Sequence, residues 1–276
     1  MLCLTYLVQL THLLIHSLTT MSPTPSLFIS HGAPDLPIRT GSTQDFLSQL
    51  FQIIPRPRAI VAVSAHWLTA HPTINQAAKP ETIYDFGGFS QNLYQLTYPA
   101  PGDPALAGRI AELLTQAGFD SRLNGQRGYD HGVWTPLILA DPDGTIPVVQ
   151  LSVQPHESLQ HHLALGTALS SLREEGVLIL GSGAATHNLW AFGDSYEAPP
   201  PKWAVEFDDW LAKTITENDT SSLLNYRNLA PFASKNHPTE EHLLPLFVAL
   251  GAGERGRQIH HNFTYGAFSM AAYAFD

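Results

Sequence analysis

The segment AIVAVSAHW, residues 59–67, holds five consecutive apolar residues, which are followed by a serine, an alanine, a histidine and a tryptophan. A continuous apolar run of this length, with no alternation of polar and apolar residues, predicts a strand that is buried on both faces of a sheet. Three further runs of this kind lie at residues 26–29, 146–153 and 177–180. We therefore expect residues 59–63 to form a central strand of a largely parallel sheet.

Helical periodicity marks the segments between and after these runs. Pro104 suits the first turn of one such helix, with Asp103 as its N-cap. Strands that alternate with helices predict an α/β fold, in which a mostly parallel or mixed central sheet is covered by helices within a single domain. The predicted helices span residues 45–54, 104–117, 157–172, 203–216 and 240–250.

The first 20 residues, MLCLTYLVQLTHLLIHSLTT, differ from the rest because they are apolar and contain no lysine or arginine. A secretory signal needs a positively charged start, and a membrane span needs about 20 mostly apolar residues without such interruptions. We therefore expect a cytoplasmic protein with no membrane segment. We predict one catalytic domain over residues 21–276. Residues 1–20 are then either a dispensable extension before a true start at Met21 or a short helix that lies on the domain.

Charge and cysteine content exclude several classes of function. The chain has 14 lysines and arginines against 24 acidic residues, a net charge of −10, and no basic run, so we expect no nucleic acid as partner. Its single cysteine excludes an intramolecular disulfide and a thiolate metal site, so any metal must be held by nitrogen and oxygen. Histidines number 14, as many as all the lysines and arginines together.

Three histidines follow the predicted strands closely. They are His31 in SHGAP, His66 in SAHW and His187 in GSGAATHNL. In open α/β sheets ligands bind beyond the carboxyl ends of the strands, so these side chains are expected to share a cleft. One such histidine alone is more often structural, but three together favour a metal site, because imidazole is a common ligand of zinc and iron.

Two more histidines have unusual local contexts. His131 lies between Asp130 and a glycine in a predicted loop, and His242 takes the third position of a predicted helix that Thr239 caps. A site with three protein ligands and open positions suits non-haem Fe(II), which must bind a substrate and dioxygen together. A further histidine that does not bind the metal would then be available for proton transfer.

The motifs along the chain, taken in order from about residue 26 to residue 270, resemble those of one known family. That family is the class III extradiol ring-cleavage dioxygenases, in particular the DOPA 4,5-dioxygenase branch. The motifs are SHGAP (30–34), RPRAIVAVSAHW (56–67), TIYDFGGFSQNLYQLTYPAPG (82–102), YDHGVWTPL (129–137), IPVVQLSV (146–153), GSGAATHNL (181–189) and HPTEEHLLPL (237–246).

The resemblance implies a role for each histidine. His31, His66 and His242 match the metal ligands, and His187 matches the catalytic acid/base, which a zinc-bound form would recruit as a fourth ligand. His131 matches a second catalytic histidine that orients substrate or oxygen. The implied cofactor is Fe(II) for activity, with Zn²⁺ as an alternative in the isolated protein. The implied reaction cleaves a small-molecule catechol such as DOPA with O₂ to a muconic semialdehyde.

Several aromatic residues, two glycines and one aspartate in these motifs are candidates for the wall that holds the substrate. Their alternative role is ordinary packing and turning of the chain. The candidates are Tyr84, Asp85, Phe86, residues 87–89, Tyr129 and Trp134.

Two other functions remain open from the sequence. Four histidines also suit a zinc-dependent hydrolase, which would activate water and consume no oxygen. A non-catalytic metal-binding or partner-binding protein of the same fold is the other alternative. The presence of both His131 and His187 favours an enzyme, because a binding protein needs no pair of proton-transfer groups.

Overall fold

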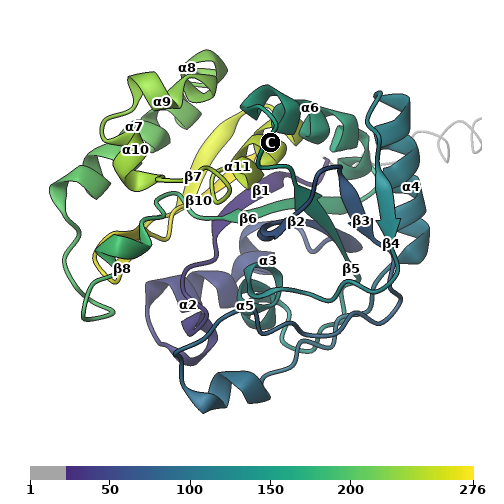
Figure 1. Cartoon of the computed structure of the whole chain (residues 1–276). Coiled ribbons are helices and arrows are strands. Elements are labelled where there is room, and N and C mark those ends of the chain that lie inside the picture. Colours follow the sequence, from purple (N-terminus) through teal and green to yellow (C-terminus); the bar gives the residue numbers. More distant parts are fainter. Residues whose placement is uncertain (1–22) are drawn as a thin grey trace, which may run out of the picture.

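A computed structural model describes residues 23–276 of the chain and contains an eight-stranded mixed sheet (Figure 1). The order of strands across the sheet is β4-β3-β5-β2-β6-β1-β10-β7, and β8 pairs with β9 separately. The strands are β1 (Ser26–Ser30), β2 (Ala59–Leu68), β3 (Thr73–Asn75), β4 (Arg122–Asn124), β5 (Val148–Val153), β6 (Val177–Gly183), β7 (Gly256–His260), β8 (Phe263–Thr264), β9 (Phe268–Ser269) and β10 (Ala272–Phe275).

The centre of the sheet consists of the four strands that the apolar runs predict. Strands β5, β2, β6 and β1 are neighbours and run parallel to one another. Strand β10 joins β1 in antiparallel fashion and β7 continues from it, which makes the sheet mixed. The prediction of an α/β fold with a mostly parallel or mixed central sheet is confirmed.

Helices cover both faces of this sheet (Figure 1). Helices α4, α6, α7 and α11 pack on one face, and α2, α3 and α5 pack on the other. The helices are α2 (Ser42–Ser48), α3 (Leu50–Ile53), α4 (Pro104–Gln116), α5 (His131–Ala140), α6 (Leu159–Leu169), α7 (Lys202–Thr216), α8 (Thr220–Leu224), α9 (Tyr226–Leu229), α10 (Ala233–Asn236) and α11 (Leu244–Ala252), with short 3₁₀ turns η1 (Leu36–Ile38), η2 (Gln91–Gln95), η3 (Ser170–Arg173) and η4 (Leu189–Ala191).

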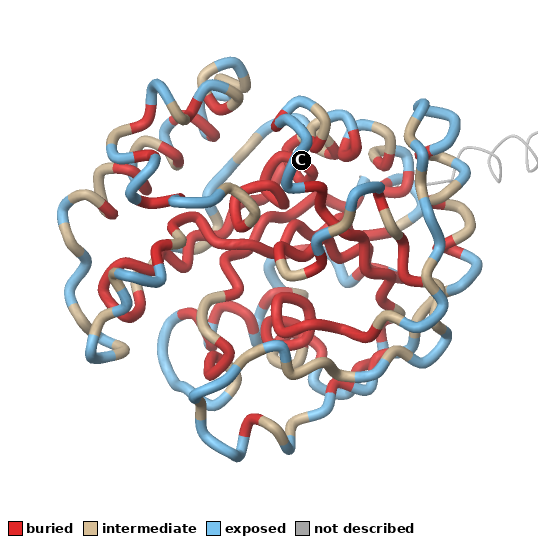
Figure 2. Tube along the Cα trace, in the orientation of Figure 1, coloured by how far each residue is buried: buried red, intermediate tan, exposed pale blue. Residues whose placement is uncertain are grey.

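Strand β2 shows why residues 59–63 are all apolar. Val61 and Val63 point into the core under α6 and α11, whereas Ile60 and Ala62 point into the core under α5. Successive side chains of a strand point to opposite faces, so a stretch that is covered on both faces is apolar at successive positions, as residues 59–63 are. The buried centre that results is continuous (Figure 2).

Most predicted helices are present, with some changes at their ends. Helix α4 begins at Pro104, and Asp103 caps it by accepting a hydrogen bond of 2.9 Å from the backbone N–H of Leu106. The predicted helix 45–54 is instead two short helices that meet at Gln49.

Helix α5 was not predicted from the sequence. It is apolar on nearly every side, contains Pro136 and is buried at most positions, so it lacks the one-sided periodicity that marks a surface helix.

Residues 1–20 and the alternative start at Met21 lie outside the described residues. Within residues 23–276, none of the helices combines the length and the apolar character that crossing a bilayer requires.

Candidate active site

The histidines gather at one edge of the sheet, beyond the carboxyl ends of β1 and β6. His31 directly follows β1, and its backbone N–H donates to the carbonyl of Gly183 at the end of β6 (2.9 Å). His66 differs from the prediction, because it lies within β2 and not after it. The pairing of β2 with β5 is interrupted between Val63 and Leu68, and such an irregularity re-aims the side chains that lie in it.

His242 reaches this edge through close packing of the chain on β6. The backbone N–H of Ala184 donates to the carbonyl of His242 at 2.9 Å. A Cβ atom on Gly183 would collide with that carbonyl oxygen, so a glycine is needed for this approach. The glycines of the GSG motif therefore allow a distant segment to bring its histidine to the site.

The predicted helical position of His242 is wrong. Helix α11 begins only at Leu244, with Pro245 in its first turn, and His242 lies in the turn before it. The hydroxyl of Thr239 does not cap a helix and instead donates to the carboxylate of Glu241 (3.0 Å). Proline is favoured in the first turn of a helix, which explains why the helix starts near Pro245.

His131 is the first residue of α5 and does not lie in the predicted loop. Its backbone N–H and its ring Nδ1 both lie 3.0 Å from Oδ1 of Asp85. Asp85 thus satisfies a free N–H at the start of the helix and holds the imidazole ring at the same time. Gly132, the next residue, leaves no room for a side chain against Ser64 and His66.

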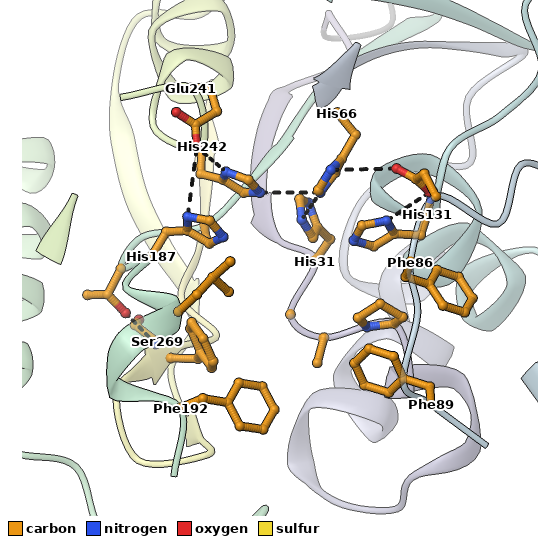
Figure 3. A pocket seen from close by; sticks show the side chains of 18 residues that line it. His31, His66, Phe86, Phe89, His131, His187, Phe192, Glu241, His242 and Ser269 are labelled. Atoms are coloured by element: carbon orange, nitrogen blue, oxygen red, sulfur yellow. Dashed lines mark hydrogen bonds and ion pairs between the residues drawn. The ribbon is translucent and has the colours of Figure 1, made fainter. Parts of the chain in front are cut away.

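Three Nε2 atoms converge at the centre of this cluster (Figure 3). Nε2 of His66 lies 3.0 Å from Nε2 of His31 and 3.2 Å from Nε2 of His242. The three histidines form one of the donor groups whose ligand atoms lie within 4.8 Å of one another.

Hydrogen bonds to the other ring nitrogens define how these histidines are protonated. Nδ1 of His31 lies 3.1 Å from the hydroxyl of Ser182, which itself donates to the carbonyl of Gly132 and so accepts from the ring. Nδ1 of His242 donates to the carboxylate of Glu241 (3.0 Å). Both rings are therefore protonated at Nδ1 and present a lone pair at Nε2.

This donor set fits a divalent metal ion. Metal-binding histidines are neutral, and their second nitrogen usually donates to a carboxylate, a carbonyl or another oxygen, as it does here. Two nitrogen ligands about 2.1 Å from one ion, at right angles to each other, lie about 3.0 Å apart, close to the separations of Nε2 in His66 from those in His31 and His242. Without a cation between them, converging lone pairs would repel.

Burial keeps these groups in the protonation states that metal binding requires. Desolvation lowers the pKa of His66 to about 3 and lowers those of His31 and His242 well below the ordinary value. Burial works to raise the pKa of Asp85, but hydrogen bonds from the ring and backbone of His131 outweigh it and lower that pKa to about 2. These three histidines are thus neutral and Asp85 is ionised at physiological pH.

His187 lies beside the three converging histidines. Its ring stacks on that of His242, with ring centres 3.4 Å apart and planes inclined by 11°. Its Nδ1 faces Glu241 at 3.9 Å, and its other nitrogen points toward the cavity (Figure 3). Burial lowers the pKa of His187 to about 4, so the ring is neutral and can accept a proton.

A cavity of about 380 Å³ opens onto this cluster. Asp85, Phe86 and Phe89, three of the predicted wall residues, line it. Further lining residues, which were not predicted from the sequence, are Gly32, Ala33, Pro34, Ala184, Thr186, Leu189, Phe192, Glu241, Phe268 and Ser269.

Three predicted substrate residues lie behind the wall and do not line the cavity. The hydroxyl of Tyr129 donates to the carbonyl of Val148 (2.8 Å), and that of Tyr84 donates to the carbonyl of Leu96 (2.8 Å). The indole N–H of Trp134 donates to a backbone carbonyl at 2.9 Å. The rings of Tyr84 and Trp134 pack with that of Phe86, and Tyr129 is buried in the core, which corrects the prediction for Tyr84, Tyr129 and Trp134.

Two residues that form hydrogen bonds to the histidines, Glu241 and Ser182, were not predicted from the sequence. The position of Glu241 directly before His242 in HPTEEH could have indicated it. The position of Ser182 between the two glycines of GSG is a weaker indication.

Comparison with known proteins identifies the family. Residues 20–276 match the family described as the catalytic LigB subunit of aromatic ring-opening dioxygenase. The chain belongs to this family. A 4,5-DOPA dioxygenase extradiol of Beta vulgaris is 43% identical over 91% of this chain and 96% of its own length. The protein of the same name from Escherichia coli K12 is 39% identical over 83% of this chain and 84% of its own length.

A solved structure supports the fold of this dioxygenase. An uncharacterized protein from Escherichia coli K12 is 34% identical and superposes with a TM-score of 0.76, covering 92% of this chain and all of the other. The resemblance to extradiol ring-cleavage dioxygenases is therefore confirmed. The protein is a ring-cleaving dioxygenase that uses a metal cofactor, a small-molecule substrate and O₂, and the hydrolase and non-catalytic alternatives are not favoured.

Proposed function

We propose that this dioxygenase cleaves the ring of a catechol next to its two hydroxyl groups, with Fe(II) held by His31, His66 and His242. The observation that carries this assignment is the convergence of three neutral Nε2 atoms, two of them set by an Nδ1 hydrogen bond to Ser182 or Glu241. Several relatives are named for ring cleavage of DOPA, which is itself a catechol.

The choice of Fe(II) follows from the number of ligands. A set of three nitrogen ligands leaves positions open for a chelating substrate and for dioxygen, as in non-haem Fe(II) oxygenases. When bound, the ion supplies Lewis acidity that makes the phenol easier to ionise, and it brings substrate and oxygen into one coordination sphere.

His187 is assigned the acid/base role. Its ring is neutral, and the nitrogen that faces the cavity can take a proton from a catechol hydroxyl. Glu241, 3.9 Å from Nδ1, then stabilises the charged ring until the proton is returned to the product. In a zinc form, His187 would be recruited as a fourth ligand, and its ring already lies beside that of His242.

His131 is assigned the positioning of substrate or oxygen from the opposite side. Asp85 holds Nδ1 of this ring, so the other nitrogen faces the cavity across from His187 (Figure 3). Phe86, Phe89 and Phe192 also line the cavity, and their apolar rings limit the access of water.

The test is anaerobic loading of the full chain with Fe(II), followed by addition of oxygen and a panel of catechols that includes DOPA. We expect oxygen uptake with formation of a yellow ring-opened product, and neither should occur with the zinc-loaded protein. If no catechol consumes oxygen in the iron-loaded protein, the proposed function is wrong. Metal-dependent hydrolysis of esters without oxygen uptake would instead support the hydrolase alternative.

A further inference from the structure

A fully buried carboxylate, that of Asp130, lies outside the cavity wall but next to His131 in the chain. Its Oδ1 accepts a hydrogen bond from the hydroxyl of Ser64 (2.6 Å). Its Oδ2 accepts one hydrogen bond from Arg127 (2.8 Å) and another from the side-chain amide of Gln150. These three partners also lie outside the wall, so Asp130 and its partners do not act on a substrate directly.

Two of these partners hold the backbone of His66 on both sides. The hydroxyl of Ser64 accepts from the backbone N–H of His66 (3.2 Å). The guanidinium of Arg127 donates to the backbone carbonyl of the same histidine (3.3 Å), and it lies 5.2 Å from the ring centre of Trp67, the next residue. Asp130 is thus linked to both backbone polar groups of His66, in each case through one other side chain.

The strand around His66 is irregular, which explains why its backbone has side-chain partners. Pairing of β2 with β6 ends at Ser64, and pairing with β5 is interrupted between Val63 and Leu68. His66 lies within this interruption. Buried backbone groups that do not pair within a sheet need other hydrogen-bond partners, and Ser64 and Arg127 provide them here.

The ring of His66 is held less closely than those of the other two converging histidines. Nδ1 of His31 and Nδ1 of His242 lie 3.1 Å and 3.0 Å from the oxygens that accept their protons. Nδ1 of His66 faces the carboxylate of Asp85 at 3.6 Å, which is longer than an ordinary hydrogen bond. The position of the His66 ring therefore depends strongly on the position of its backbone.

Asp130 also fixes the start of the helix that carries His131. It is the N-cap residue of α5, and its carbonyl accepts from the backbone N–H groups of Val133 (2.9 Å) and Trp134 (3.0 Å). The ring centres of His66 and His131 are only 3.9 Å apart. One buried residue thus connects the two segments that bring these rings together.

We infer that Asp130 and Arg127 are positioning residues of the metal site, which together fix the His66 ring through its backbone. The inference deepens the proposed function and rests on it, because it takes His66 as a metal ligand. Loss of either partner would leave the other as a buried charge without its counter-ion, and the backbone that both support would shift. The ligand would then be displaced although no group that touches the metal or the substrate had changed.

The opposite end of the same helix offers a matched control. Asp141 is the C-cap residue of α5, is also buried, and pairs with Arg56 at 2.7 Å. It accepts further hydrogen bonds from the hydroxyl of Thr145 (3.1 Å) and the backbone N–H of Ile146 (2.8 Å). Asp141 and Arg56 lie outside the cavity wall, so their replacement should lower stability without moving a metal ligand.

The test measures Co(II) affinity, the visible absorption bands of bound Co(II), and the melting temperature of the metal-free full chain. Asp130→Asn should weaken Co(II) binding by about 10- to 100-fold and change the absorption bands, as is usual when the support of a metal ligand is removed. Arg127→Gln should weaken binding by about tenfold. Asp141→Asn and Arg56→Gln should lower the melting temperature to a similar extent, but their Co(II) affinity should stay within about twofold of wild type and their bands should not change.

A double variant tests whether the two residues act together. Asp130→Asn combined with Arg127→Gln leaves neither charge unpaired, so it should weaken Co(II) binding by less than the product of the two single losses. If Asp130→Asn does not fold, Arg127→Gln and Arg56→Gln still make the comparison, since their side chains are 22% and 49% exposed.

Three results would overturn the inference. They are wild-type affinity and bands in Arg127→Gln, an equal loss of affinity in the control variants, and single losses that multiply in the double variant. A wild-type chain that binds no Co(II) would overturn the proposed metal site and this inference with it. Normal binding by the wild type and by every variant would overturn this inference alone, so the two failures can be distinguished.

Discussion

The two ends of the cavity are built in different ways. At the inner end, His31 and His242 each hold a hydrogen bond at Nδ1 to a fixed partner, and both are buried. At the outer end, Leu189 and Phe192 are 65% and 42% exposed, and they belong to the short turn η4 or follow it directly. The inner end is held by a strand edge and a buried helix, whereas the outer end is formed by loops.

The inner end of the cavity is therefore suited to the reaction, and the outer end to contact with the rest of the substrate. A metal ion and a proton-transfer group require distances accurate to a fraction of an ångström, which hydrogen bonds to buried elements can maintain. Apolar contact with a substituent tolerates larger shifts, so it can come from exposed loops. Substitutions at the inner end should therefore change metal binding and turnover, and those at the outer end should change substrate preference.

The largest effect on metal binding is expected when one of the three converging imidazole rings is removed. His66→Ala should reduce affinity for Fe(II) by more than about 100-fold and abolish oxygen uptake, because it removes a direct ligand. Metal content after gel filtration measures this loss. His71→Ala is the matched control, since this histidine is half exposed and lies three residues after β2. Normal iron content in His66→Ala would refute the assignment of the inner end.

A smaller loss should follow removal of the proton-transfer group. His187→Gln should retain iron but lower kcat by about 100- to 10,000-fold, which is the usual contribution of general acid/base catalysis. Iron content and kcat are measured on the same preparation, with the exposed His156→Gln as the control. If His187→Gln loses iron as completely as His66→Ala, then His187 is a ligand and the three-ligand assignment is wrong.

Asp85, at the inner end, interacts with both His131 and His66, so its replacement tests whether these rings need a carboxylate partner. Asp85→Asn should weaken metal affinity or turnover by about 10- to 100-fold, because Asp85 positions the ring of His131 and lies 3.6 Å from Nδ1 of His66. Asp120→Asn, at an exposed position, should have no such effect. An unchanged Asp85→Asn variant would show that His131 needs no carboxylate partner.

At the outer end, Phe192→Ala should raise KM for an apolar catechol by about tenfold, equivalent to about 1.4 kcal/mol of lost contact. Iron content should stay at the wild-type level and kcat should change by less than about threefold. Leu123→Ala, an exposed apolar residue on β4, serves as the control. A loss of iron in Phe192→Ala would contradict the separation of the two ends.

The smallest effect concerns pH. A histidine with an ordinary pKa of about 6.5 is mostly protonated at pH 5.5 and must lose that proton to bind a metal ion. Each such histidine would weaken metal binding roughly tenfold at pH 5.5, and three would weaken it about a thousandfold. Burial lowers the pKa values of His31, His66 and His242 far below this range, so the sites are already deprotonated at pH 5.5. Metal affinity should therefore change by less than about threefold between pH 7.5 and pH 5.5, as measured by titration with Co(II). A loss near a thousandfold would show ordinary histidine pKa values in the metal-free protein.

Much of the scaffold was predictable from the sequence because strand burial leaves a local signal. The apolar runs at residues 26–29 and 59–63 mark β1 and β2, and the prediction of histidines beyond such strands drew attention to His31 and His66. Helix α5 left no such signal, because a helix that is buried all round has no polar face. The wall of the cavity was harder to predict, since a buried tyrosine such as Tyr129 and a lining phenylalanine such as Phe192 look alike in the sequence.

The sequence by itself determined the α/β class, the parallel centre of the sheet and the set of histidines, because each depends on residue type and local spacing. Only the tertiary structure decided which nitrogen of each ring faces the centre, since that depends on partners such as Ser182 and Glu241 that are distant or unremarkable in the chain. It also decided the character of the outer end, where Leu189 and Phe89 line one cavity although about 100 positions of sequence separate them. Contacts between distant segments leave no periodic pattern in the sequence, so only the folded chain shows which residues line this cavity.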